Sequence, residues 1–434
     1  MARVPTHDVP EWTSTRYGDA RRWLDRPGPI AMIDLDKLKT TDGLDLKAKR
    51  VIVRADLNVP VKDGRVTDAT RLARLVPGLR ELAGRGARVV VISHFGRPKG
   101  GPDPQYSLKP VADKLGELLG LPVAFAEDCI GEPAERTVAA LLPGHIAVLE
   151  NLRFHKGEEK DDAGFAKRLA ALGDVFVNDA FSAAHRAHAS TDALARMLPA
   201  YAGPLLMEEI NALVSVLEKP RKPTAAVIGG AKVSTKIDVL INLAAKVDKL
   251  IVGGAMANTF LLAEGVGIGK SLAEPELTKT ALEIMHAAKQ RHCEVILPRD
   301  VVVAARFEAG APSTVVPTLE VPADQMILDV GPRSVAHCAD IIGACSTLLW
   351  NGPLGAFEID PFGAGTFALA RAAAALTKAG KLTSVAGGGD TVAALNTAGV
   401  TGSFTYVSTA GGAFLEWLEG RTLPGVAALI PARS

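Results

Sequence analysis

Val227-Ile228-Gly229-Gly230 is the stretch of this chain that says most about its fold, because a short apolar run ends there in two glycines. Four later runs end in the same way, at 250–254, 348–352, 385–390 and 407–412. Each pattern predicts a buried strand followed by a tight turn. The C-terminal ends of parallel strands share one edge of a sheet, and glycine turns before helices expose backbone N–H groups. We therefore expect this half of the chain to bind a phosphorylated ligand.

Length and composition bound the class of protein. At ~150 residues per domain, 434 residues predict two or three domains, and 48% hydrophobic residues suffice for their cores. A net charge of +1 speaks against charge-driven binding to nucleic acid or to a membrane surface. No run of 18 apolar residues predicts a transmembrane helix. The scarcity of cysteine fits a reducing cytoplasm and speaks against a disulfide framework or a structural zinc site. The four cysteines, without CxxC spacing, are Cys129, Cys293, Cys338 and Cys345.

The first 31 residues differ from the rest of the chain. They are polar and of mixed charge, and they lack the apolar core of a signal peptide. We expect a poorly ordered extension to which no role is assigned. Met32 opens a more regular segment and is a candidate alternative start.

The first half of the chain also alternates strands with helical stretches. Strands are predicted at 51–53, 89–92, 146–149 and 175–177, with helices such as 108–119 and 163–172 between them. Such alternation favours parallel α/β units with right-handed crossovers. Leu-Pro-Ala-Tyr-Ala-Gly-Pro at 198–204 indicates a boundary, and a helix follows at 207–218 until prolines end it. The prediction is two α/β domains joined by one helix.

Strands of the first half run into charged side chains instead of glycines. Guanidinium groups gathered at one sheet edge would suit a small polyanion, and Asp56 and Asn58 would suit its hydroxyl. A single arginine is more often a solvated surface residue, so only the set favours function. His185 and His188 are three apart, but without an HExxH pattern we do not predict zinc. The basic set is Arg54, Arg71, His94, Arg97, Arg153 and Arg186.

The glycine-rich half contains no GxxxxGK[ST] phosphate loop and no GxGxxG fingerprint. Lys232 and Lys236 are four apart at the predicted opening of a helix, which places them on one face for phosphate binding; a solvated pair is equally compatible. Asp390 follows the Gly387-Gly388-Gly389 turn and is a candidate Mg²⁺-nucleotide contact, or else a plain helix cap. Glu358 is a candidate acceptor for ribose hydroxyls.

Eight segments, in order, resemble the phosphoglycerate kinase family, and the resemblance covers the chain from about Met32 onward. They are RADLNVP (54–60), SHFGRP (93–98), LENLRFHKGEE (149–159), NDAFSAAHRAHAS (178–190), GGAKVSTKI (229–237), WNGPLGAFE (350–358), GGGDT (387–391) and STAGGA (408–413). The resemblance implies two Rossmann-like domains with parallel sheets, a hinge helix at 207–218, and a C-terminal tail that packs on the N-terminal domain. The implied domains are 32–203 with about 419–434, and 204–418.

The resemblance also implies the reaction, namely reversible phosphoryl transfer between 1,3-bisphosphoglycerate and ADP, which gives 3-phosphoglycerate and ATP with Mg²⁺. Lys232 and Arg71 are expected to contact the transferring group, and Asp390 to hold Mg²⁺ through the nucleotide. Implied substrate contacts are Asp56, Leu57, Asn58, Arg71, His94, Phe95, Gly96, Arg97, Arg153 and Arg186. Implied nucleotide contacts are Lys232, Lys236, Gly254, Asn351, Glu358, Gly388, Gly389, Asp390 and Thr391. Such chemistry needs positioning and charge neutralisation, with no protein nucleophile.

Two departures and two alternatives accompany this resemblance. Ser182-Ala183 stands where the family usually has Gly-Thr, and Ala410 where a third glycine is common. One alternative is a non-catalytic paralogue that binds nucleotide or sugar phosphate, against which Lys232, Arg71 and Asp390 speak. The other is a dinucleotide-dependent oxidoreductase, against which the missing fingerprint speaks. A monomeric cytoplasmic enzyme is expected.

Overall fold

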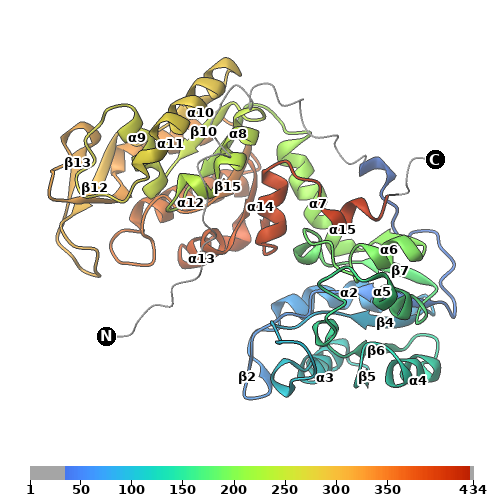
Figure 1. Ribbon diagram of the computed structural model, residues 1–434. Helices are drawn as coiled ribbons and strands as arrows, with labels where there is room; N and C mark the ends of the chain where they lie inside the picture. Colours follow the sequence, from blue (N-terminus) through green and yellow to red (C-terminus); the bar gives the residue numbers. More distant parts are fainter. Residues whose placement is uncertain (1–34, 431–434) are drawn as a thin grey trace.

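The computed structural model describes residues 35–430. The predicted extension at 1–31 and the candidate start at Met32 lie outside the described residues. The described chain forms two lobes, each built on a six-stranded parallel sheet (Figure 1). The α/β class with two parallel sheets is as predicted, because apolar runs alternate with amphipathic helices along the whole chain.

The N-terminal lobe has the strand order β5-β6-β4-β1-β7-β8. Its strands are β1 (Arg50–Arg54), β4 (Arg88–Ile92), β5 (Val123–Ala126), β6 (Ile146–Leu149), β7 (Val175–Asn178) and β8 (Ala200–Ala202). Along β1, Val51 and Val53 pack under α2 (Thr70–Gly84) and α3 (Lys109–Leu119), whereas Ile52 faces the opposite core. That core includes α4 (Glu132–Ala140), α5 (Ala163–Ala170) and α6 (Ala193–Met197). A hairpin of β2 (Val61–Lys62) and β3 (Arg65–Val66) precedes α2.

The C-terminal lobe repeats this plan with the order β11-β10-β9-β15-β16-β17. Its strands are β9 (Thr224–Ile228), β10 (Lys249–Val252), β11 (Glu294–Ile296), β15 (Thr347–Asn351), β16 (Thr383–Gly387) and β17 (Tyr406–Ser408). One face carries α8 (Ile237–Ala244), α9 (Ala255–Ala263) and α10 (Thr278–Gln290). The other carries α11 (Pro332–Gly343), α12 (Ala364–Lys378) and α13 (Gly389–Thr397). All five glycine-ended runs are therefore strands of one sheet.

A three-stranded antiparallel sheet, absent from the sequence predictions, is attached to the C-terminal lobe. It has the order β13-β12-β14, with β12 (Asp300–Ala304), β13 (Ser313–Pro317) and β14 (Met326–Val330). Asp300 is buried in it and accepts hydrogen bonds from the N–H groups of Arg333 and Ser334, at 3.0 and 2.7 Å, at the start of α11. This link fixes the small sheet to the main one.

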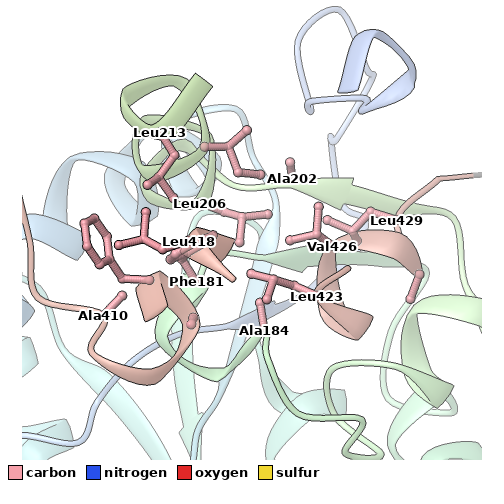
Figure 2. Close-up of a cluster of buried hydrophobic side chains, with 14 of the residues drawn as sticks. Phe181, Ala184, Ala202, Leu206, Leu213, Ala410, Leu418, Leu423, Val426 and Leu429 are labelled. Carbon is pink, nitrogen blue, oxygen red and sulfur yellow. The ribbon is translucent and has the colours of Figure 1, made fainter. Parts of the chain in front are cut away.

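The two lobes meet at α7 (Pro204–Leu217), α14 (Gly412–Leu418) and α15 (Pro424–Ala427). The connecting helix begins three residues before the predicted 207, because Pro204 occupies its first turn, where proline needs no N–H partner. A single apolar core joins Leu206 and Leu213 of α7 to Leu418 of α14 and Val426 of α15 (Figure 2).

The C-terminal tail returns to the N-terminal lobe, as the resemblance implies. The Gly425 N–H donates to the Ala184 carbonyl at 2.8 Å, and the Asn178 side chain donates to the Gly425 carbonyl at 3.1 Å. Among residues 35–430, no helix is long and apolar enough to cross a membrane.

Candidate functional site

A basic pocket of about 250 Å³ lies at the C-terminal edge of the first sheet. The chain reverses its direction of strand addition there, since β4 and β7 flank β1, and α/β folds bind ligands at such a switch point. Six of the predicted substrate residues line this pocket, namely Asn58, His94, Gly96, Arg97, Arg153 and Arg186. Distant segments therefore bring four arginines together, because Arg54 lines the pocket as well.

Sequence reasoning missed several residues of this pocket. Arg54 was part of the basic set but was not assigned to the site, and Ser182, Ala183, His185 and His188 also line it. Arginines lie beside both histidines: Arg186 Nε donates to His185 Nε2 at 3.1 Å, and Arg153 and Arg186 lie near His188. Burial, together with the nearby Arg153 and Arg186, lowers the pKa of His188 to about 4. The short spacing between His185 and His188 was the available sequence signal, but such spacing is considered first for a metal site.

Leu57 and Phe95, also predicted to contact the substrate, are not among the residues that line the basic pocket. Both side chains are buried, and their backbone groups are already paired. The Leu57 N–H donates to Ser93 Oγ at 3.0 Å and its carbonyl accepts from Val59. Phe95 exchanges two hydrogen bonds with the Asn151 side chain, at 3.1 and 2.7 Å. These two residues hold the shape of the loops, and their contact with the substrate stays a prediction.

Asp56 and Arg71 lie in a smaller hollow of about 50 Å³ between the lobes. Arg71 Nη1 contacts Asp56 Oδ2 at 3.1 Å, and its Nη2 donates to the Thr409 carbonyl of the other lobe at 3.4 Å. The two departures from the family pattern belong here. Ser182 Oγ donates to Asp56 at 2.7 Å, and Ala410 is buried in the core that joins the lobes (Figure 2). Arg71 therefore stands beside the hinge, with its guanidinium held between the lobes.

A second large pocket, of about 350 Å³, lies at the C-terminal edge of the second sheet. Gly230, Gly254 and Pro353 line it from the turns after β9, β10 and β15, and Asp390 from the start of α13. Of the predicted nucleotide residues, Gly254, Glu358 and Asp390 line the pocket. Its apolar wall was not foreseen, because Met326 and Leu328 come from the antiparallel sheet and Leu272 and Phe307 from loops.

The glycines of these turns serve close backbone packing as well as ligand access. A Cβ atom on Gly229 would overlap the Pro353 carbonyl, and one on Gly352 would overlap the Gly229 carbonyl. Gly254, at a φ of +68°, would place a Cβ 2.6 Å from the Gly230 carbonyl oxygen. The turns after β9, β10 and β15 therefore touch one another, and only glycine permits that approach.

Lys232 and Lys236 do not share a helix face, contrary to the prediction. A 3₁₀ turn (Val233–Thr235) separates them, and α8 begins only at Ile237. Lys232 is exposed, whereas Lys236 Nζ donates to the Gly229 carbonyl at 2.6 Å and to Asn351 Oδ1 at 2.7 Å. Burial lowers the pKa of Lys236 to about 8, and nearby Asp390 opposes that shift.

Asn351 and Thr391, both expected to contact nucleotide, instead join the glycine turns. Both are buried. Asn351 donates to the Gly387 carbonyl at 2.7 Å, and Thr391 Oγ1 accepts from the Gly352 N–H at 2.7 Å. Gly388 caps α13 and Gly389 opens it, so their N–H groups lie at a helix N-terminus beside Asp390.

One group of metal-type side chains lies outside both pockets. Ligand atoms of Asp128, Cys129 and His155 lie within 4.8 Å of one another. His155 Nε2 hydrogen-bonds Asp128 Oδ1 at 2.6 Å, and the same oxygen accepts from the Cys129 N–H, also at 2.6 Å. Burial raises the pKa of the Cys129 thiol. These hydrogen bonds account for the cluster without an ion.

Comparison with known proteins decides the family. A family model described as phosphoglycerate kinase matches residues 41–421. The chain belongs to the phosphoglycerate kinase family. A phosphoglycerate kinase of Methylorubrum extorquens is 61% identical over 388 residues, covering 89% of this chain and 97% of that relative. One of Bradyrhizobium diazoefficiens is also 61% identical, covering 91% and 99%.

Solved structures of phosphoglycerate kinases share the fold. The enzyme of Coxiella burnetii is 44% identical with a TM-score of 0.85, covering 90% of this chain and 98% of that structure. The enzyme of Pyrococcus horikoshii is 31% identical with a TM-score of 0.75 over the same shares. This chain is accordingly a glycolytic kinase that transfers a phosphoryl group between 1,3-bisphosphoglycerate and ADP. The comparisons give no support to a non-catalytic paralogue or to an oxidoreductase.

Proposed function

We propose that the two large pockets divide the substrates of this kinase between the lobes. The basic pocket takes 3-phosphoglycerate or its 1,3-bisphosphate, because Arg97, Arg153 and Arg186 offer forked donors to a small polyanion. The second pocket takes ADP or ATP, because its apolar wall suits a base and its glycine turns expose N–H groups to phosphates. The single observation that carries this assignment is the contrast in chemistry between the two pockets. The corresponding functional units are residues 32–203 with about 419–434, and residues 204–418.

Transfer is direct and in line. A β-phosphate oxygen of ADP attacks the phosphorus of the acyl phosphate, while the bond from phosphorus to the carboxyl oxygen breaks. The electron pair stays on that oxygen, so the leaving group departs as a carboxylate, a weak base that needs no proton. The protein supplies position and positive charge, with Lys232 and Arg71 as the groups that meet the transferring phosphoryl.

Mg²⁺ would be held through the nucleotide by Asp390. Its carboxylate is exposed at the first turn of α13, beside the pocket and near Lys236, and this fits an ion that prefers one carboxylate plus phosphate oxygens and water. Such an ion neutralises phosphate charge during transfer. The Gly388 and Gly389 N–H groups lie beside that carboxylate and would orient the same phosphates.

Closure of the lobes about α7 brings the two substrates together. Because the proposed pockets belong to different sheets, the reacting atoms meet only if the lobes approach, which also excludes water from the acyl phosphate. Arg71 already reaches the Thr409 carbonyl across this junction at 3.4 Å. We further propose a monomeric cytoplasmic enzyme, in keeping with four free and buried cysteines in the described residues.

A coupled spectrophotometric assay of ATP formation from 1,3-bisphosphoglycerate and ADP tests the assignment. We expect turnover that requires Mg²⁺. Lys232→Ala should lower kcat at least about 100-fold, the scale seen when one preorganised charge is lost from a transition state. Lys289→Ala, an exposed lysine of α10, serves as the matched control. Binding of both substrates without turnover by the wild-type chain would refute the proposed chemistry, and near-normal kcat for Lys232→Ala would refute the role of that lysine.

A further inference from the structure

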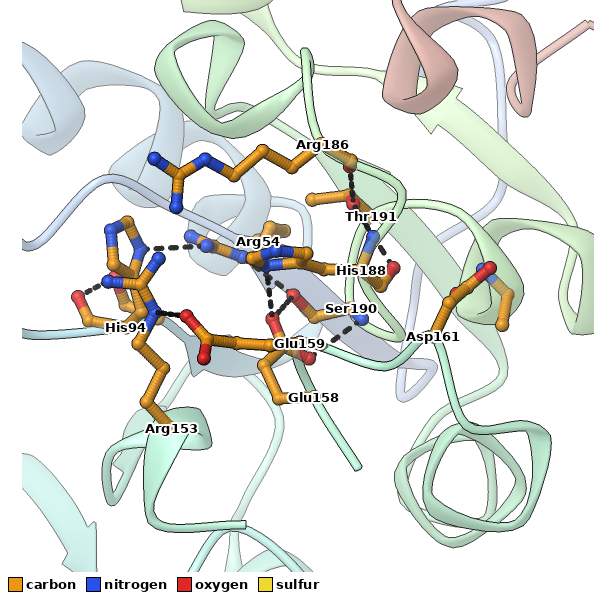
Figure 3. Close-up of polar contacts among 12 residues, drawn as sticks. Arg54, His94, Arg153, Glu158, Glu159, Asp161, Arg186, His188, Ser190 and Thr191 are labelled. Atoms are coloured by element: carbon orange, nitrogen blue, oxygen red, sulfur yellow. Dashed lines mark hydrogen bonds and ion pairs between the residues drawn. The ribbon is translucent and has the colours of Figure 1, made fainter. Parts of the chain in front are cut away.

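A buried arginine and a buried glutamate, joined through a serine, lie at the basic pocket. Arg54 ends β1 with 1% of its surface exposed, and Glu158 is fully buried. Ser190 stands between them (Figure 3). Arg54 Nε donates to Ser190 Oγ at 3.0 Å, and Ser190 Oγ contacts Glu158 Oε1 at 2.6 Å. The Ser190 N–H donates to the other carboxylate oxygen at 3.0 Å.

Arg54 fixes the direction of the hydrogen bonds that run from it through Ser190 to Glu158. A guanidinium group has five donors and no acceptor, so Ser190 Oγ must accept from it. The single hydroxyl proton of Ser190 is then free for Glu158 Oε1. Both oxygens of Glu158 accept, as a carboxylate does. Glu158 is the fully buried acid that offsets the charge of Arg54 inside the protein, and Asp56, which is also paired with Arg71, contributes as well.

The same guanidinium determines the protonation of His94. Arg54 Nη2 lies 2.9 Å from His94 Nδ1, and since Arg54 only donates, Nδ1 must carry a lone pair. The ring proton of a neutral imidazole is then on Nε2. Among residues 35–430, His94 Nε2 has no protein partner, and His94 lines the basic pocket. The ring therefore presents one N–H donor to whatever fills the pocket.

A second proton on His94 would be opposed from several directions. It would sit on Nδ1 and face the Arg54 donor at hydrogen-bond distance. Arg153, Arg186 and His188 also face the ring, from the segments after β6 and β7 (Figure 3). Burial and these cations hold the pKa of His94 well below its usual value. The imidazole is neutral throughout the physiological range.

We propose that Glu158, through Ser190 and Arg54, is a positioning residue that holds His94 as a neutral Nε2–H donor for an anionic oxygen of the substrate. This inference deepens the proposed function and rests on it for the identity of the substrate. The arginines supply the positive charge that attracts the polyanion, whereas the His94 N–H fixes the orientation of the bound anionic oxygen. A guanidinium without its buried carboxylate would be drawn toward water or toward the substrate, and His94 would lose the contact that selects its tautomer.

The tautomer can be measured without any assay of activity. Protein labelled with ¹⁵N at histidine is observed by long-range ¹⁵N–¹H correlation, and His94→Gln assigns the signal. We expect a pyridine-like Nδ1 and a pyrrole-like Nε2 that do not titrate from pH 5.5 to 8. An Nδ1–H tautomer, or a midpoint near the ordinary histidine value, would overturn the proposal.

Kinetics separate positioning from mere support of the fold. Glu158→Gln keeps shape but removes charge, and we expect KM for 3-phosphoglycerate to rise about tenfold or more while KM for ATP changes less than about twofold. Glu158→Asp should recover part of the loss. Asp300→Asn, which removes another buried carboxylate from the other lobe, is the matched control and should lower the melting temperature without this KM split. Equal changes in both KM values for Glu158→Gln would contradict the proposal.

Ser190→Ala keeps the proposal testable if Glu158→Gln fails to fold. The substitution breaks the contacts between Arg54 and Glu158 at a neutral residue. The His94 signal should then show mixed tautomers, and KM for 3-phosphoglycerate should rise. An unchanged His94 signal in Ser190→Ala would count against the chain of contacts. Failure of the proposed function is distinguishable, because it would appear as absent turnover in the wild-type protein, whatever the tautomer of His94.

Discussion

Arg74 Nη2, on α2 of the N-terminal lobe, donates to the phenol oxygen of Tyr406, on β17 of the C-terminal lobe, at 3.1 Å. The same nitrogen pairs with Glu208 of α7 at 2.9 Å, so one guanidinium ties together both lobes and the helix between them. Glu209, the next residue of α7, is buried beside the Tyr406 and Ser408 hydroxyls, and burial raises the pKa of its carboxyl. This junction is the polar counterpart of the apolar core in Figure 2.

Tyr406→Phe should loosen that junction. The substitution keeps the ring and removes the hydroxyl that accepts from Arg74 and lies beside Glu209. A hydrogen bond to a charged group contributes roughly 1.5–3 kcal/mol. Because Arg74 is partly exposed, we expect a loss of about 1 kcal/mol in the free energy of unfolding by urea, with a larger radius of gyration in X-ray scattering. Tyr201→Phe is the control, since its hydroxyl has no protein partner among residues 35–430. Identical unfolding curves for the two variants would argue against a tether.

Stability should fall as pH rises through the range in which Asp179 ionises. Asp179 is buried and accepts from the Leu205 N–H at 2.7 Å at the start of α7, and burial raises its pKa to about 7. Between the unfolded pKa near 4 and the folded pKa near 7, the native state binds the extra proton. The contribution is therefore complete at low pH and lost as pH passes 7.

Comparison with Asp179→Asn isolates this effect, because the amide can still accept from Leu205 and does not titrate. From pH 5.5 to 8, the wild type should lose about 2 kcal/mol of unfolding free energy relative to the variant. Urea unfolding at several pH values measures the difference. Parallel pH profiles would mean that Asp179 is ionised in the folded protein throughout.

Lys232→Met and Lys236→Met should have different consequences. Lys232 is exposed, so its loss should lower kcat while leaving the free energy of unfolding within about 0.5 kcal/mol of the wild type. Lys236 binds Gly229 and Asn351, so its loss leaves buried acceptors unpaired and should cost about 1–3 kcal/mol and raise KM for ATP. Each variant controls for the other in unfolding and steady-state measurements. Equal stability of the two would contradict the structural role of Lys236.

Gly388→Ala should selectively damage the pocket that we propose for the nucleotide. Gly388 has a φ of +101°, and a Cβ there would lie 2.6 Å from Asn351 Nδ2, which pairs with Gly387. We expect a loss of about 1–3 kcal/mol in stability and a higher KM for ATP, with KM for 3-phosphoglycerate unchanged. Gly343→Ala, at the end of α11 with open space around it, is the control. A Gly388→Ala enzyme with normal KM for ATP would show that this turn tolerates a side chain.

Local patterns predicted the strands and helices well where one periodic signal dominates. The buried runs at 51–53 and 227–228 belong to central strands, in keeping with the continuous apolar runs of strands that a parallel sheet buries on both faces. The antiparallel sheet escaped prediction. Its strand β13 is largely exposed, with burial too slight to leave a periodic signal, and β12 pairs with residues 9 to 29 positions further along the chain. Pairing over such distances has no local signature.

The site residues also divide into those that a local motif predicted and those whose contacts only the folded structure shows. Arg97, Arg153 and Arg186 could be named from their motifs, because charged groups after parallel strands meet at one sheet edge. Whether a residue touches ligand or supports its neighbour depends on burial. Lys236, Asn351 and Thr391 were predicted to contact the nucleotide, and the structure shows all three hydrogen-bonded to the glycine turns of the second pocket.

The sequence alone therefore determined the α/β class, the two-lobed plan and the chemistry of each pocket, since all three depend on residue type and spacing along the chain. Tertiary structure decided which nitrogen of His94 carries its proton, how Glu158 offsets Arg54, and how the Gly229 and Gly352 turns meet. Arg54 alone joins residues 40 and 136 positions away, at His94 and Ser190. Hydrogen-bond direction, desolvation and close backbone contact exist only after folding brings such segments within a few ångströms.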